Sequence, residues 1–206
     1  MIHQTADLSL KNLCIDRNEQ QILHHLTLHC HLGQVWQIIG PNGSGKSSLL
    51  HVLAGLSAAR RGRMQWQNQP LLSQHSLYLS HTLNLKASLT VRENLQLFLS
   101  LQPPRLATTL TKALIEFDLE SLQNRFIHTL SAGQQRRVNL AKLALSTAPL
   151  WLLDEPFTAL DQDQCAKFLT RIEQFVLQQG LVLFTSHQTL TFQQLQCQYY
   201  YLEERQ

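Results

Sequence analysis

The chain has 206 residues, 44% of them hydrophobic, a length that fits one domain or one domain with a small subdomain. Only 15% of its residues are charged, well below the roughly 25% of average soluble proteins, which argues against a disordered effector and indicates a surface covered by a partner. The net charge of +3 is too small to predict nucleic-acid binding, and no apolar run reaches the ~20 residues of a membrane span. The four cysteines lie far apart and the first ten residues lack a signal-peptide pattern, so we expect a cytosolic chain without zinc or disulfides.

Short strand-like runs alternate with helical runs through the first part of the chain. Five strands are predicted there, at Leu8–Cys14, Leu26–Cys30, Val35–Ile39, Arg63–Trp66 and Leu77–Leu79. One helix is predicted over Lys46–Ala54, because Gly55 follows it at a position typical of a helix end. This alternation indicates an α/β fold.

The second part of the chain is first helical and then alternating again. The helical pattern covers Val91 to about Ser146, with breaks at Pro103-Pro104 and at Asn124–Thr129. Then come a strand, a helix and a strand, at Leu150–Leu153, about Asp163–Gln178 and Leu181–Thr185. Both strands are uniformly apolar, which is typical of parallel strands buried on both faces. We therefore expect a helical subdomain at 82–146, inserted into a core formed by 1–81 and 147–206.

A phosphate-binding loop is predicted between the third strand and the first helix. The pattern G-x-x-x-x-G-K-[ST] is matched by Gly40, Pro41, Asn42, Gly43, Ser44, Gly45, Lys46 and Ser47, with Ser48 next in the helix. In such a loop the backbone N–H groups and the helix N-terminus bind phosphate oxygens. Lys46 is expected on the β- and γ-phosphates of ATP, and the Ser47 hydroxyl on Mg²⁺. A chance glycine-rich turn would match in only roughly one chain in a hundred of this size.

Two carboxylates follow the apolar strand Leu150–Leu153. Acidic residues there could serve solubility alone, but beside a phosphate loop they predict chemistry. Asp154 is expected to hold the Mg²⁺ that Ser47 also coordinates, and Glu155 to orient and deprotonate the attacking water. Both motifs end strands, and ligands of doubly wound sheets collect beyond the carboxyl ends of the strands.

The segment Leu130-Ser131-Ala132-Gly133-Gln134 resembles the signature motif of ABC-transporter ATPases, usually LSGGQ, with Ala132 replacing the first glycine. The other motifs agree in order: Ala159-Leu160-Asp161 is similar to the D-loop and His187 to the switch histidine of that family. The resemblance covers the whole chain. It implies one ABC-type ATPase domain over 1–206, with a P-loop core of mixed, mostly parallel sheet and an N-terminal antiparallel part.

In the family, the signature motif faces the phosphate loop of a second subunit. The resemblance therefore implies a homodimer that binds ATP between its subunits, with contacts from Ser131, Ala132, Gly133, Gln134 and Asp161. His187 is expected to assist catalysis at the γ-phosphate, although a lone histidine would more often be structural. Ser131 to Gly133 are also expected to begin a long helix, with Ser131 as its N-cap.

Two positions depart from the family pattern. Counting back from Thr90-Val91-Arg92-Glu93-Asn94 places His81 where the family has the Q-loop glutamine near the metal-bound water. The aromatic residue that stacks on adenine is missing near positions 15–18. Arg17 is the candidate replacement there, because a planar guanidinium can stack on a base, and an ordinary surface charge is the alternative.

Within the family, the short chain and motifs such as Ser186-His187-Gln188 are most similar to ATP-binding subunits that serve haem export in bacterial cytochrome c maturation. This resemblance implies integral membrane partners and a peripheral position at the cytoplasmic face of the inner membrane. We expect no direct haem ligation by the ten histidines and no nucleic-acid partner. The apolar, non-periodic stretch Leu83–Leu89 is expected to receive a short helix of the membrane subunit.

Other functions stay open from the sequence. The chain could serve another small bacterial exporter, or phosphorylate a small acceptor as a soluble P-loop phosphotransferase. The signature motif argues against the phosphotransferase. ABC ATPases that act on DNA or ribosomes usually have two ATPase halves or a coiled-coil insertion, for which this chain is too short.

Overall fold

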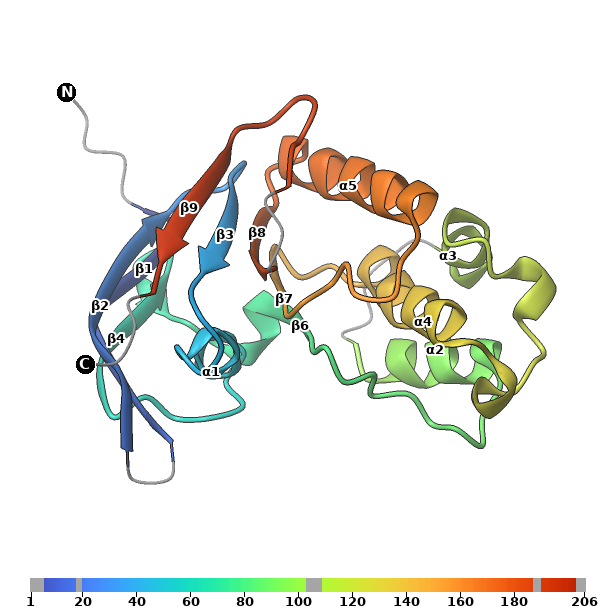
Figure 1. Ribbon diagram of the computed structural model, residues 1–206, viewed down its shortest axis with the longest axis horizontal. Coiled ribbons are helices and arrows are strands. Elements are labelled where there is room, and N and C mark those ends of the chain that lie inside the picture. Colours follow the sequence, from blue (N-terminus) through green and yellow to red (C-terminus); the bar gives the residue numbers. More distant parts are fainter. Residues whose placement is uncertain (1–5, 18–19, 103–108, 187–189, 203–206) are drawn as a thin grey trace. The chain divides into compact units, whose positions relative to one another are not determined.

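A computed structural model of the chain describes residues 6–17, 20–102, 109–186 and 190–202 (Figure 1). The chain divides into two compact units. The core unit consists of Met1–Tyr78, Ala148–Glu155 and Ala166–Gln206, and the helical unit of Leu79–Thr147 and Pro156–Cys165. The helical unit thus takes in Pro156–Cys165, a segment that the sequence pattern predicts in the core.

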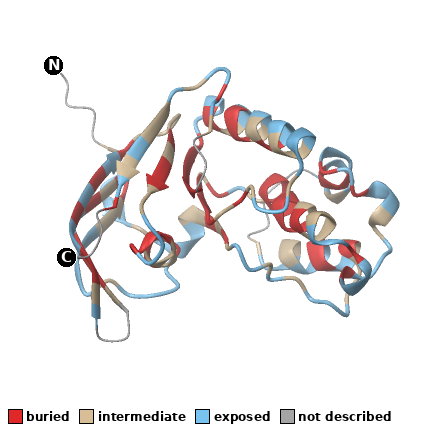
Figure 2. Cartoon of the chain, viewed as in Figure 1, coloured by how far each residue is buried: buried red, intermediate tan, exposed pale blue. Residues whose placement is uncertain are grey.

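The main sheet of the core unit has five strands in the order β6-β7-β8-β3-β9. Their bounds are β3 Val35–Ile39, β6 Ser76–Leu79, β7 Leu150–Leu153, β8 Leu181–Thr185 and β9 Cys197–Tyr201. Strands β7, β8, β3 and β9 pair in parallel. Every residue of β7 and β8 is buried, as Figure 2 shows in red for β8, so the predicted two-sided burial is confirmed. Trp151 stacks on Phe175 of α5 (Gln162–Leu177), with ring centroids 3.6 Å apart.

The second sheet is antiparallel, in the order β2-β1-β4-β5. Its strands are β1 Leu8–Arg17, β2 Gln20–Cys30, β4 Arg61–Trp66 and β5 Gln69–Pro70. One apolar core joins this sheet, helix α1 (Lys46–Leu53) and one face of the main sheet. The predicted α/β class, with a mostly parallel core and an antiparallel N-terminal part, is therefore confirmed.

Strands β1 and β2 are longer than the sequence predicted. Register shifts interrupt their pairing, and Asn12 and His25 adopt positive φ angles of 49° and 47°. An extra residue at such a bulge breaks the alternation of buried and exposed positions. The period of two therefore identified only Leu26–Cys30, whereas the strand begins at Gln20.

Strand β9 was not predicted at all. It is an edge strand with no fully buried residue, so it lacks the apolar run that marked β7 and β8. It lies beside β3, and just beyond its end Leu202 N–H donates to the Ile39 carbonyl, 2.7 Å away, immediately before the phosphate loop.

The helical unit contains α2 (Val91–Ser100), α3 (Leu110–Glu116) and α4 (Ala132–Leu145), with short 3₁₀ turns at Glu120–Leu122 and Ile127–Thr129. A further 3₁₀ turn, Ser73–His75, lies in the core unit. Thr90 and Glu93 form a capping box at the start of α2, which satisfies backbone donors that the helix cannot pair itself. In the part of the chain that the structure describes, none of the helices has the length and apolar character needed to cross a membrane.

Candidate functional site: a phosphate loop and paired carboxylates

The phosphate loop lies between the end of β3 and the start of α1, as predicted. Gly45 has a φ of 98°, and a Cβ there would lie 2.6 Å from Cγ2 of Ile22, so this turn requires glycine. Lys46 is buried, and its Nζ donates to the carbonyl oxygens of Gly40 at 2.7 Å and Pro41 at 2.9 Å. An ammonium group has three N–H donors, so one remains for a further acceptor.

The loop fits an anionic ligand. Among the described residues, the buried Ser44 hydroxyl has no hydrogen-bond partner, which leaves a polar donor inside the loop. Helix α1 has no side-chain cap and no acidic residue in its first turn, so its N-terminal N–H groups are not shielded by the protein's own anions. Pro41, Asn42 and Gly43 are exposed, and Ser47 and Ser48 are half-buried.

Asp154 and Glu155 lie at the same edge of the sheet as the phosphate loop. The order β7-β8-β3, with parallel pairing throughout, puts the carboxyl ends of all three strands at one edge. Asp154 is 2% exposed, and Glu155 adopts a left-handed φ of 49°. A side-chain oxygen of Asp154 together with the hydroxyl of Ser47 is a donor set that suits Mg²⁺.

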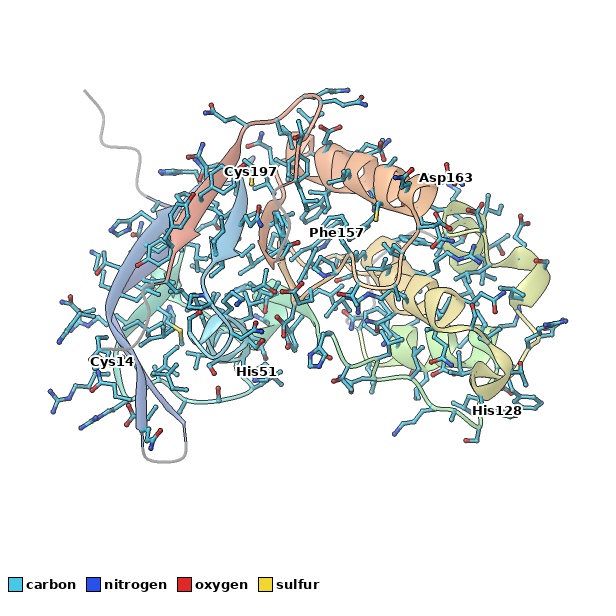
Figure 3. All side chains as sticks on the ribbon, viewed as in Figure 1. Cys14, His51, His128, Phe157, Asp163 and Cys197 are labelled. Atoms are coloured by element: carbon cyan, nitrogen blue, oxygen red, sulfur yellow. The ribbon has the colours of Figure 1, made fainter. Side chains whose placement is uncertain are left out.

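Two residues that no sequence motif identifies contact the Asp154 carboxylate. The Thr185 hydroxyl donates to Oδ1 at 2.8 Å, and the Tyr78 hydroxyl donates to Oδ2 at 3.5 Å. Burial first, and then the charge of Asp154, raise the pKa of Tyr78, so the phenol stays protonated as a donor. His51 of α1, labelled in Figure 3, packs edge-on against the Tyr78 ring with centroids 5.2 Å apart. No local motif marks these contacts, because the partners lie on different strands.

Thr185 also accepts the backbone N–H of Glu155, at 2.9 Å. On the neighbouring strand, Gln37 in the middle of β3 donates from Nε2 to the carbonyl oxygen of Ser186, the residue after β8, at 3.2 Å. The predicted His187 lies outside the described residues, as does the side chain of Arg17, whose backbone ends β1.

The signature motif lies in the helical unit and begins α4. Ser131 is its N-cap and forms a capping box with Gln134, which confirms the predicted helix start. A Cβ at Gly133 would lie 3.1 Å from the carbonyl oxygen of Ala159, whereas Ala132 is exposed. The third position of the motif thus has room for the methyl group of alanine, whereas a side chain at the fourth would crowd the backbone at Ala159.

Asp161 and His81 also belong to the helical unit. Asp161 accepts the N–H of Gln164 at 2.9 Å, as an N-cap does at the start of α5. His81 is exposed, with Nε2 3.2 Å from the Thr82 hydroxyl. The carbonyl oxygens of Ser80 and His81 both accept hydrogen bonds from the buried guanidinium of Arg136.

The segment after His81 has no regular structure and is held by side chains. Lys142 donates to the Asn84 carbonyl oxygen at 3.4 Å, and Asn94 makes three hydrogen bonds to the backbone of Lys86 and Leu89. His128, labelled in Figure 3, contacts the carbonyl oxygen of Ala87 at 2.9 Å. Leu83, Leu85 and Leu89 are half-buried in this segment.

The histidines of β2 lie on its exposed positions 24, 25 and 29. Within the described ranges, no three side chains of His, Cys, Asp or Glu gather as ligands of a metal ion.

Comparisons with known proteins agree with this arrangement. The family model "ABC transporter" matches residues 23–158. A Yersinia pestis protein named "Cytochrome c biogenesis ATP-binding export protein CcmA" is 39% identical over 189 residues, which cover 89% of this chain and 87% of that protein.

Solved structures match as well. One titled "Structure of ATP binding subunit of ABC transporter" has a TM-score of 0.79 and 28% identity, covering 87% of this chain and 79% of its own. A dimeric bacterial ABC transporter cassette has a TM-score of 0.74 and 25% identity, covering 86% and 87%. The phosphate loop, the signature helix and these matches together show that the chain belongs to the ABC transporter family, as an ATP-binding subunit.

Proposed function

We propose that the chain couples ATP hydrolysis to membrane subunits that export haem, or release haem from its chaperone, in the maturation of c-type cytochromes. The observation that carries the proposal is the 39% identity to a cytochrome c biogenesis protein over 189 residues. The proposal places the chain at the cytoplasmic face of the bacterial inner membrane, as a peripheral subunit.

The core unit supplies the nucleotide site. The phosphate loop from Gly40 to Ser48 binds the phosphates through backbone N–H groups, the α1 N-terminus and the remaining donor of Lys46. Arg17 stacks on the adenine.

Hydrolysis uses the carboxylates at the sheet edge. Asp154 and Ser47 are the residues that would hold Mg²⁺, with His81 assisting, and the ion would supply charge neutralisation at the phosphates. Glu155 orients the attacking water toward the γ-phosphate and accepts a proton from it. His187 donates a hydrogen bond to the γ-phosphate.

The second half of each ATP site comes from another copy of the chain. The N-terminus of α4 offers the N–H groups of Ala132 to Gln134 and the Ser131 hydroxyl to a γ-phosphate, with the positive end of the helix dipole behind them. Asp161 lies in the same unit and completes the subunit contact. ATP therefore holds two subunits together, and hydrolysis releases them.

The membrane subunit docks on the segment Leu83–Leu89. Its leucines are half-buried, and side chains of the helical unit hold its backbone in place. Its direct connection to His81 offers a route by which a change at the nucleotide reaches the membrane.

Complementation tests this function. Expression of the chain in a bacterium that lacks its own haem-export ATPase should restore haem-stained c-type cytochromes, and Lys46→Ala should not. Full ATPase activity of the purified chain without any restoration of cytochromes would favour another small exporter. A phosphorylated small acceptor in place of free phosphate would favour a phosphotransferase.

A further inference from the structure

We infer that Thr185 is a positioning residue that aligns both carboxylates of the hydrolytic site through one hydroxyl group. The inference deepens the proposed ATP hydrolysis and rests on the roles given there to Asp154 and Glu155. Thr185 itself would not touch ATP.

A hydroxyl group has one proton to donate and two lone pairs that accept hydrogen bonds, and the Thr185 hydroxyl uses both functions. It accepts the N–H of Glu155 at 2.9 Å, so its proton is free to point to Asp154 Oδ1 at 2.8 Å. Thr185 has no exposed surface, which keeps water from competing for either bond. A hydroxyl used as donor and acceptor at once links the orientation of one carboxylate to the backbone of the other.

The bond to Glu155 acts on an unusual backbone. Glu155 has a φ of 49°, in the left-handed region that non-glycine residues seldom adopt. A hydrogen bond at its own N–H holds this conformation and so sets where the side chain leaves the backbone. Asp154 receives Tyr78 on its other oxygen, so the carboxylate is held from two sides.

Two variants at Thr185 separate a role in alignment from a role in packing. Valine has nearly the shape of threonine and suits a strand, so Thr185→Val keeps the packing of β8 while it removes both hydrogen bonds. Thr185→Ser keeps the hydroxyl and loses a methyl group. The two variants therefore separate hydrogen bonding from volume.

The experiment measures ATP turnover and ATP affinity on the full chain. With Thr185→Val we expect kcat to fall by about tenfold to a hundredfold, the cost of a misplaced catalytic group. ATP affinity in EDTA should stay unchanged, because the phosphate loop is untouched, while the gain in ATP affinity on adding Mg²⁺ should shrink. Thr185→Ser should keep most of the wild-type kcat and most of the gain in ATP affinity on adding Mg²⁺.

Thr170→Val is the matched control, because Thr170 is exposed on α5 and its hydroxyl donates to the Ala166 carbonyl oxygen within the same helix. Wild-type kcat in Thr185→Val, or an equal loss of kcat in Thr185→Ser, would overturn the inference. So would a loss of ATP affinity in EDTA, which would indicate general damage. The affinity measurements need no turnover, so they test Thr185 even if the proposed hydrolysis by the wild type were wrong.

Discussion

Arg136 donates from Nε to the carbonyl oxygen of Pro156, 3.1 Å away, and its Nη1 donates to the carbonyl oxygen of Ser80 at 3.2 Å. Arg136 is 3% exposed and lies in the second turn of the signature helix. One buried guanidinium therefore joins the segment before His81, the segment after Glu155 and the start of α4.

Replacing Arg136 by leucine should destabilise the helical unit. Buried carbonyl oxygens would lose their donors, and each unpaired group costs about 1–3 kcal/mol, so we expect the free energy of unfolding to fall by about 2 kcal/mol or more. Urea denaturation measures it. Arg137→Leu is the control, since Arg137 contacts the carbonyl oxygens of Phe117 and Asp118 nearer the surface and should cost less. Equal losses in the two variants would contradict the prediction.

Lys46→Ala and Glu155→Gln should impair turnover in different ways. The first removes the buried ammonium of the loop, so ATP affinity and kcat should fall together. The second keeps the side-chain shape but removes the base, so kcat should fall while ATP affinity stays. Phosphate release and equilibrium ATP binding measure the two quantities. Wild-type turnover by Glu155→Gln would show that another group is the base.

The signature helix should control ATP-driven dimerisation. In the Glu155→Gln background, Mg-ATP should convert monomer to dimer in light scattering. Ser131→Arg should abolish this shift, because a bulky cation would fill the donor site at the start of α4. Ser121→Arg places the same cation on an exposed 3₁₀ turn of that unit and serves as control. A dimer that is indifferent to both ATP and Ser131→Arg would exclude the two-subunit ATP site.

Leu85→Glu should release the chain from membranes without loss of ATP affinity. A carboxylate in the segment Leu83–Leu89 would have to be desolvated on docking. Fractionation of cells that co-express the membrane subunits measures the bound fraction. Leu101→Glu, at a leucine that is 75% exposed after α2, is the control. If the Leu85→Glu chain stays membrane-bound, the docking surface lies elsewhere.

Lys142 should make the free energy of unfolding depend on pH in the alkaline range. Burial lowers its pKa from 10.5 to about 8, so between these values the unfolded chain binds a proton that the folded chain does not. Stability from this group therefore rises as the pH rises from 8 toward 10.5. Compared with Lys142→Met, the wild type should gain about 2 kcal/mol of unfolding free energy between pH 8 and about 9.5.

Urea denaturation at the two pH values measures that gain. Lys112→Met removes one positive charge from an exposed position on α3 and is the control. A constant difference between the wild type and Lys142→Met would contradict the prediction.

Local patterns predicted the elements that carry their own signal. The apolar runs of β7 and β8 identified buried strands, because a parallel strand covered on both faces must be apolar throughout. Ser131 was identified as an N-cap because a hydroxyl there satisfies a backbone donor only three residues away. The bulged strand β2 and the edge strand β9 have no such signal. The predicted bounds of β2 were therefore wrong, and β9 was not predicted.

Local sequence patterns are enough to predict the family motifs, the α/β class and the order of most elements, since each depends on residues close together in the chain. Which groups meet depends on the folded chain: Thr185 contacts Asp154 across 31 positions, and Arg136 contacts Ser80 across 56. Such contacts depend on strand order, register and the path of each loop. Periodicity describes which face of an element is buried, but it does not specify which residue of another element contacts that face.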